Sequence, residues 1–132
     1  MRYLLMMHAP RGTGEYEIFN WAPDDFQAHM AHLQQINREL TEAGEWVDAL
    51  ALAPPAQAVL VRAGTDGAPV TDDAFPETKE FLAGYWLVDV DSPGRAYAIA
   101  ARASAAPGPG GAPLNMPIEV RQVMSAPPAP EA

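Results

Sequence analysis

Five ionisable side chains crowd into one short segment of this chain, and four of them are acidic. When like charges share a site, the pKa of one carboxyl group rises, and that group becomes usable as an acid or a base. The same composition is also typical of a charged turn that lies in solvent, where the lysine neutralises one of the carboxylates. Both interpretations stay open for this segment, which consists of Asp72, Asp73, Glu77, Lys79 and Glu80.

Two histidines lie in a stretch whose apolar residues recur with helical spacing. At about 100° per residue, His29 falls inside the apolar arc bounded by Met30 and Ile36, whereas His32 falls on its polar flank. An imidazole that faces a sheet can serve as general acid or base near neutral pH when a carboxylate orients it. The alternative is a buried structural histidine that is hydrogen-bonded to the backbone.

A metal site is a third possibility, because neutral imidazole is a good ligand for zinc, copper or iron. His29 and His32 are three residues apart on a helix and point about 60° away from each other. Nothing in the sequence brings His8 near them. We therefore predict no metal site and no cofactor.

Two arginines, Arg2 and Arg121, fall on what should be neighbouring central strands. Such a pair can clamp an anionic ligand, although an arginine in this position is as often part of an ion pair at the rim. His8 ends the first strand, and Lys79 lies in the acidic turn. These four side chains are the candidate ligand-binding residues.

Composition narrows the class of protein. A length of 132 residues with 48% hydrophobic content suits one compact domain. The 17 acidic and 8 basic residues give a formal charge of -9, which repels phosphate backbones and anionic lipid surfaces. We therefore expect neither nucleic-acid nor membrane binding. The absence of cysteine excludes disulfides and thiolate catalysis and fits a reducing compartment.

The lengths of the apolar segments indicate where in the cell the protein is expected. No segment reaches the roughly 20 apolar residues that span a bilayer, and the first apolar run, residues 3–7, is too short for a signal peptide. We expect a soluble, cytoplasmic protein.

Two helices and several strands can be placed along the chain. Pro23 suits a first helical position and Gly44 a stop, so residues 23–43 should form a helix. A second helix, rich in alanine, should run from Ser92-Pro93 to about Ala105. The apolar residues 2–8 predict a central strand, residues 45–71 predict two or three antiparallel strands, and residues 84–90 and 118–123 predict the last two.

This order of elements predicts an α+β fold, a ferredoxin-like antiparallel sheet with two helices on one face. The other face must be covered as well, because Tyr85, Trp86, Trp46 and the methionines of the first strand cannot all face the helices. A second copy related by a two-fold axis is the simplest cover, which makes the expected assembly a homodimer, a dimeric α+β barrel. The domain should span residues 1–124, and residues 125–132 should form a disordered Pro/Ala tail.

The segment 70–80, followed by the hydrophobic residues 82–90, resembles the signature of the YCII-related, or DGPF-domain, family. In that family a Thr-Asp-Gly-Pro-Phe-like turn precedes a Glu-x-Lys-Glu element and a hydrophobic strand. Here the Gly-Pro of the turn is Asp73-Ala74. Residues 52–55 and 119–121 resemble the family's Leu-x-Pro stretch and its closing strand, so the resemblance covers most of the chain.

The resemblance implies a ferredoxin-like fold, dimerisation through the sheet and a small-molecule or enzymatic role. It also implies a His/Asp pair, for which His29 with Asp72 is the match in this sequence and His32 is the alternative. Two functions stay open. One is a homodimeric protein that binds a small anionic or phenolic ligand or has a regulatory role. The other is a lyase- or isomerase-like enzyme that transfers protons through the His/Asp pair.

Overall fold

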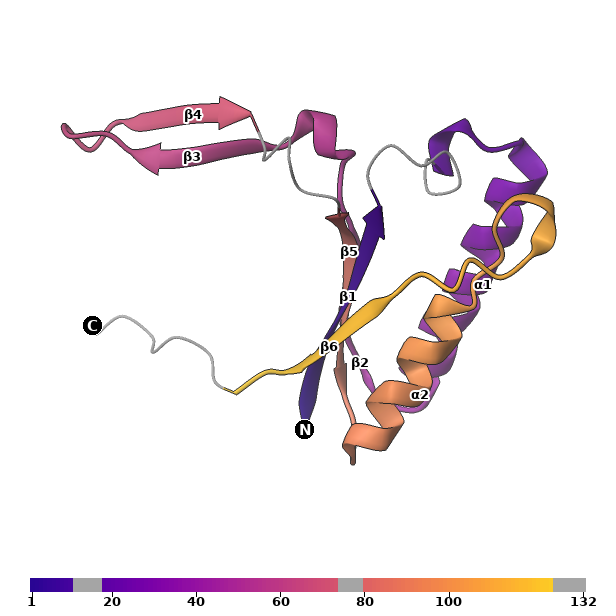
Figure 1. Ribbon diagram of the computed structural model, residues 1–132. Coiled ribbons are helices and arrows are strands. Elements are labelled where there is room, and N and C mark those ends of the chain that lie inside the picture. The colour runs from indigo at the N-terminus through magenta and orange to yellow at the C-terminus, as the bar shows by residue number, and fades with distance from the viewer. Residues whose placement is uncertain (11–17, 74–79, 125–132) are drawn as a thin grey trace.

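A computed structural model describes residues 1–10, 18–73 and 80–124 (Figure 1). The fold is α+β, with two helices, a four-stranded antiparallel sheet and a separate two-stranded one. The larger sheet has the strand order β2-β5-β1-β6. Its members are β1 (Arg2–Pro10), β2 (Trp46–Ala51), β5 (Glu80–Asp89) and β6 (Ile118–Gln122).

The first strand lies inside the sheet, as its apolar run predicts. β1 pairs with β5 on one side and with β6 on the other, both antiparallel. Alternate residues of a strand face opposite sides of a sheet. Tyr3 and Leu5 are 5% and 0% exposed in the core under the helices, whereas Leu4 and Met6 on the other face are half-buried.

Helix α1 (Pro23–Glu42) begins and ends where the sequence predicts. Pro23 occupies the first turn, where its missing N–H costs nothing. At the other end Gly44 has φ of +73°, and the amides of Gly44 and Glu45 donate to the carbonyls of Thr41 and Leu40. These two hydrogen bonds form a Schellman motif, which satisfies the last carbonyl groups of the helix.

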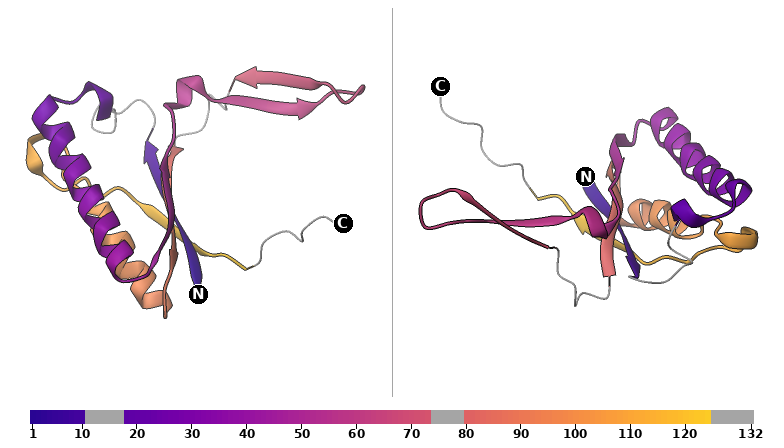
Figure 2. Two further views of the ribbon diagram at one scale, coloured as in Figure 1. Left: turned by 180° about the vertical axis from the view of Figure 1, so that it is seen from behind. Right: turned by 90° about the horizontal axis from the view of Figure 1, so that it is seen from above.

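Helix α2 (Pro93–Ser104) opens on Ser92, whose Oγ accepts a hydrogen bond of 3.2 Å from the amide of Arg95. Its buried face is made mostly of alanine, with Ile99 the largest member. Both helices lie on the same side of the four-stranded sheet (Figure 2). The core between them and the sheet includes Ile36, Leu40, Val88 and Ile99.

The hairpin of β3 (Val59–Ala63) and β4 (Pro69–Asp73) forms a sheet of its own. It projects from the body on the side of the sheet opposite the helices (Figure 2). The chain reaches it through Ala53-Pro54-Pro55, and prolines, which lack an amide hydrogen, interrupt strand pairing. Short 3-10 turns complete the described chain, at Ile18–Asn20, Pro55–Gln57 and Pro109–Gly111.

Within the described ranges, neither helix is long and apolar enough to cross a membrane.

Candidate functional site

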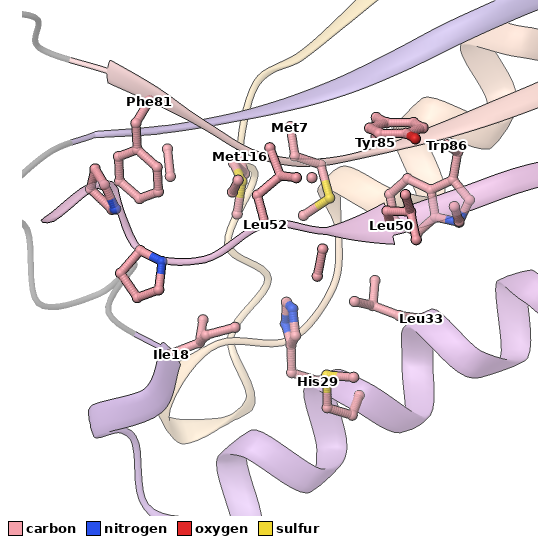
Figure 3. A pocket seen from close by; sticks show the side chains of 18 of the residues that line it. Met7, Ile18, His29, Leu33, Leu50, Leu52, Phe81, Tyr85, Trp86 and Met116 are labelled. Atoms are coloured by element: carbon pink, nitrogen blue, oxygen red, sulfur yellow. The ribbon is translucent and has the colours of Figure 1, made fainter. Parts of the chain in front are cut away.

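A cavity of about 670 Å³ opens between α1 and the sheet, at the end of the sheet where β1 stops (Figure 3). Met7, Leu33, Phe81 and Met116 are among the apolar side chains that line it. Pro54 and Pro55, which lead into the β3–β4 hairpin, also contribute. None of the described residues that line the cavity is Asp, Glu, Lys or Arg.

His29 is a buried polar residue at the floor of this cavity. Its side chain rises from α1 into the space, and the residue is only 2% exposed (Figure 3). The Nδ1 atom lies 3.0 Å from the backbone carbonyl oxygen of Pro107. A carbonyl oxygen only accepts hydrogen bonds, so Nδ1 carries the hydrogen and Nε2 of the neutral ring is the acceptor. No other hydrogen bond to the His29 side chain forms within residues 1–10, 18–73 and 80–124.

Burial holds His29 in the neutral form. Removal from water lowers the pKa of the imidazole below its ordinary value of 6.5, and the nearby His32 lowers it further. The hydrogen bond to Pro107 acts in the opposite direction and is the smaller effect compared with burial. At neutral pH the site therefore presents a hydrogen-bond acceptor, not a cation.

Two aromatic residues fix the polar groups beside the cavity. The indole of Trp21 meets the imidazole of His29 edge to face, with 5.2 Å between ring centroids and 86° between the planes. The indole nitrogen of Trp86 donates a hydrogen bond of 2.8 Å to Oδ1 of Asn37. This bond identifies which end of the Asn37 amide is the oxygen and leaves its nitrogen as a donor.

The chain was also compared with known proteins, and residues 1–111 match the family model of the YCII-related domain. The chain belongs to the YCII-related family. A protein of Rhizobium meliloti (strain 1021), described as uncharacterised, is 32% identical over 72 residues, which cover 54% of this chain. The match spans 58% of that relative's length. The family resemblance predicted from the segment 70–90 is thereby confirmed.

The YCII resemblance pointed to Asp72 as the partner of His29, and the structure places these residues on separate elements. Asp72 lies on β4, opposite Leu60 in the projecting hairpin, and does not line the cavity. Within one chain, the group that orients His29 is the carbonyl of Pro107. His32, the alternative, binds the carbonyl oxygen of Arg102 at 2.8 Å through Nε2 and so ties α1 to α2.

Three of the predicted ligand-binding residues, His8, Arg2 and Arg121, do not line the cavity. His8 and Arg121 share Glu119 on the helix-free face of the sheet, with N–O distances of 3.0 Å and 3.8 Å. Arg2 is exposed on the same face, where the register sets it opposite Asp89. Lys79 lies outside the described residues, as does the rest of the segment 74–79. No three His, Asp or Glu side chains within the described ranges are grouped as metal ligands.

Asn37, Trp21 and Pro107 are the site residues that the sequence analysis missed. Asn37 carried a usable signal, because it follows Leu33 by four residues, as Leu33 follows His29, so the three lie along one side of α1. Pro107 acts through its backbone oxygen, which any residue at that position would supply. Its role could not be inferred from residue type.

Proposed function

We propose that this YCII-related protein is a homodimer that binds a small molecule in the cavity beside His29. The cavity itself carries the proposal. Its volume of about 670 Å³ lies within the range of ligand pockets, roughly 300–1,000 Å³, and its wall has the usual make-up of an apolar lining with a few fixed polar groups.

The ligand-binding part has a direct test. Replacing Leu33 with Trp puts an indole into the cavity from α1 and should abolish binding of small apolar probes such as biphenyl, followed by calorimetry. Tyr97→Trp is the matched control, because Tyr97 is 58% exposed on α2 and does not line the cavity. Equal binding by both variants and the unmodified protein would contradict the proposal.

The dimer part rests on apolar surface that a single chain leaves uncovered. The strand order β2-β5-β1-β6, with both helices on one face, supports a ferredoxin-like sheet, and we propose that its domain spans residues 1–124. The other face of this sheet carries Leu4, Met6 and Leu87. The hairpin adds Val59, Val61 and Val70, which are 58%, 62% and 54% exposed. An isolated two-stranded hairpin is marginally stable in water. A second copy packed on this side, as a dimeric α+β barrel, would cover both surfaces.

Proton transfer is the second candidate function, and the fixed tautomer of His29 favours it. An imidazole with Nδ1–H held by a carbonyl presents Nε2 as a base in a site protected from water. The His/Asp pair of a lyase- or isomerase-like reaction would then need the hairpin of a second copy, because β4 projects away from its own α1 (Figure 1). Substituting each residue of the pair in turn separates the two functions.

A further inference from the structure

Two polar side chains of α1 whose hydrogen bonds the protein fixes, His29 and Asn37, stand at opposite ends of the part of the helix that lines the cavity. His29, Leu33 and Asn37 follow one another at steps of four residues, so they lie along one side of the helix. At about 1.5 Å of rise per residue, His29 and Asn37 are separated by about 12 Å along the axis. Leu33 lies between them on the cavity wall (Figure 3), and Met30 and Gln34 of α1 also line the cavity.

The two ends offer opposite hydrogen-bonding functions. Nε2 of His29 accepts, because Nδ1 already donates to the carbonyl of Pro107. The amide nitrogen of Asn37 donates, because Oδ1 already accepts from the indole of Trp86. Both orientations are therefore set by the protein before any ligand enters.

The site is also poor in charge. No Asp, Glu, Lys or Arg occurs among the described residues of its lining, and the imidazole there is a neutral acceptor. An ionised ligand would lose its hydration without gaining an opposite charge, which is costly in an apolar cavity. An uncharged ligand avoids this cost.

We infer that the ligand of the small-molecule site proposed above is an uncharged, elongated and mostly apolar molecule with different polar groups at its two ends. A hydroxyl or other donor binds Nε2 of His29, and an acceptor such as a carbonyl oxygen binds the amide nitrogen of Asn37. The expected ligand is thus neutral, with a donor at one end and an acceptor at the other, and not the anionic molecule that the sequence suggested.

A matched set of probes tests the donor end on the unmodified protein. We would measure calorimetric affinities for biphenyl, para-phenylbenzyl alcohol, the methyl ether of that alcohol and para-phenylbenzoate. One hydrogen bond predicts that the alcohol binds about 3- to 10-fold more tightly than biphenyl or the ether. The benzoate should bind most weakly. Failure of all four to bind would overturn the proposed function, whereas binding of biphenyl with equal affinity for alcohol and ether would overturn only the present inference.

Two variants locate the ends. In His29→Phe the alcohol should bind no more tightly than biphenyl or the ether, because the acceptor is gone. The acceptor end needs one more probe, the same alcohol with an acetyl group on its far ring, which should bind the unmodified protein more tightly than the alcohol itself does. Asn37→Asp keeps an acceptor for Trp86 but removes the donor, so this advantage of the acetyl group should be lost in that variant. Tightest binding of the benzoate by the unmodified protein, or an undiminished alcohol advantage in folded His29→Phe, would refute the assignment.

Discussion

His29 combines two properties that a surface histidine lacks. It is buried, and its Nδ1 hydrogen is held by a backbone carbonyl 78 residues away in sequence. Both follow from its place at the apolar face of α1, where the imidazole lies under the loop that contains Pro107. The result is a neutral ring with one defined acceptor, which is the chemical centre of the proposed site.

The burial of His29 predicts a pH dependence of stability. Its pKa is lowered in the folded chain, so below pH 6.5 the unfolded chain takes up a proton that the folded chain refuses. The contribution of His29 to the free energy of unfolding is therefore intact above pH 6.5. It declines as the pH falls from 6.5 toward the lowered pKa that His29 has in the folded chain, by at most about 1.4 kcal/mol per pH unit. Urea denaturation of the protein and of His29→Leu across this range isolates the effect. Parallel pH profiles for the two would exclude a lowered pKa at His29.

Paired substitutions decide whether His29 and Asp72 act together. His29→Gln should lower the free energy of unfolding by about 1–3 kcal/mol, because a buried group becomes imperfectly satisfied, and should weaken binding of a hydroxylated probe. Asp72 lies on the hairpin and does not line the cavity, so Asp72→Asn should leave the affinity for that probe unchanged if the cavity acts alone. A loss of turnover in both variants, with folding intact, would instead support the acid-base enzyme. Unchanged affinity and activity in His29→Gln would reject His29 as a site residue.

The inward orientation of His29 could be predicted from sequence, but its partner could not. The direction in which a helical residue points depends only on local spacing. That spacing correctly predicted that His29 lies on the buried face of α1, with Ile36. The pairing with Asp72 came from a family resemblance and needs contacts between distant segments. Those contacts depend on where the hairpin lies, which no local pattern of residues 59–73 specifies.

At the scale of elements, local signals were sufficient for the helices and insufficient for the hairpin. Pro23, Gly44 and Ser92 act within one helical turn, and both helices have the predicted bounds. The strands of residues 45–71 were predicted as antiparallel, and the structure has three of them. Only β2 joins the main sheet, however, because the prolines at 54 and 55 intervene before β3.

The contact between β2 and β5 requires a glycine at position 84. A Cβ atom there would lie 2.7 Å from the carbonyl oxygen of Leu50, which is backbone and cannot move aside cheaply. We expect Gly84→Ala to destabilise the fold by about 1–3 kcal/mol, measured by urea denaturation. Gly94→Ala is the control, because its Cβ would meet only the Oγ of Ser92 at 3.9 Å. The same loss of stability in both variants would show that close strand packing is not the cause.

At the scale of the whole molecule, a single chain leaves one side of its main sheet without helices, and the β3–β4 hairpin projects from the body on that side (Figure 2). The sequence predicted an uncovered face from the number of large apolar residues, but it named Trp86 among the candidates for that face. The structure buries Trp86 under α1, where Asn37 satisfies its nitrogen. Residues such as Leu82, which the register sets beside His8 on the helix-free face, remain for a second copy to cover.

Charged substitutions on that side should therefore separate the copies without harming the fold of each. Val61 is 62% exposed and Leu82 is 37% exposed in one chain, so a lysine at either position costs the monomer little. In a dimer of standard size, with roughly 1,200–2,000 Å² buried, the same lysine would have to be desolvated. Light scattering at micromolar concentration should thus show twice the chain mass for the unmodified protein and for Tyr97→Lys, whose side chain lies on the exposed part of α2. It should show the mass of one chain for Val61→Lys or Leu82→Lys. If the unmodified protein were a monomer, the proposed dimer would be refuted. If both lysine variants were still dimers, the interface would lie on a different surface of the chain.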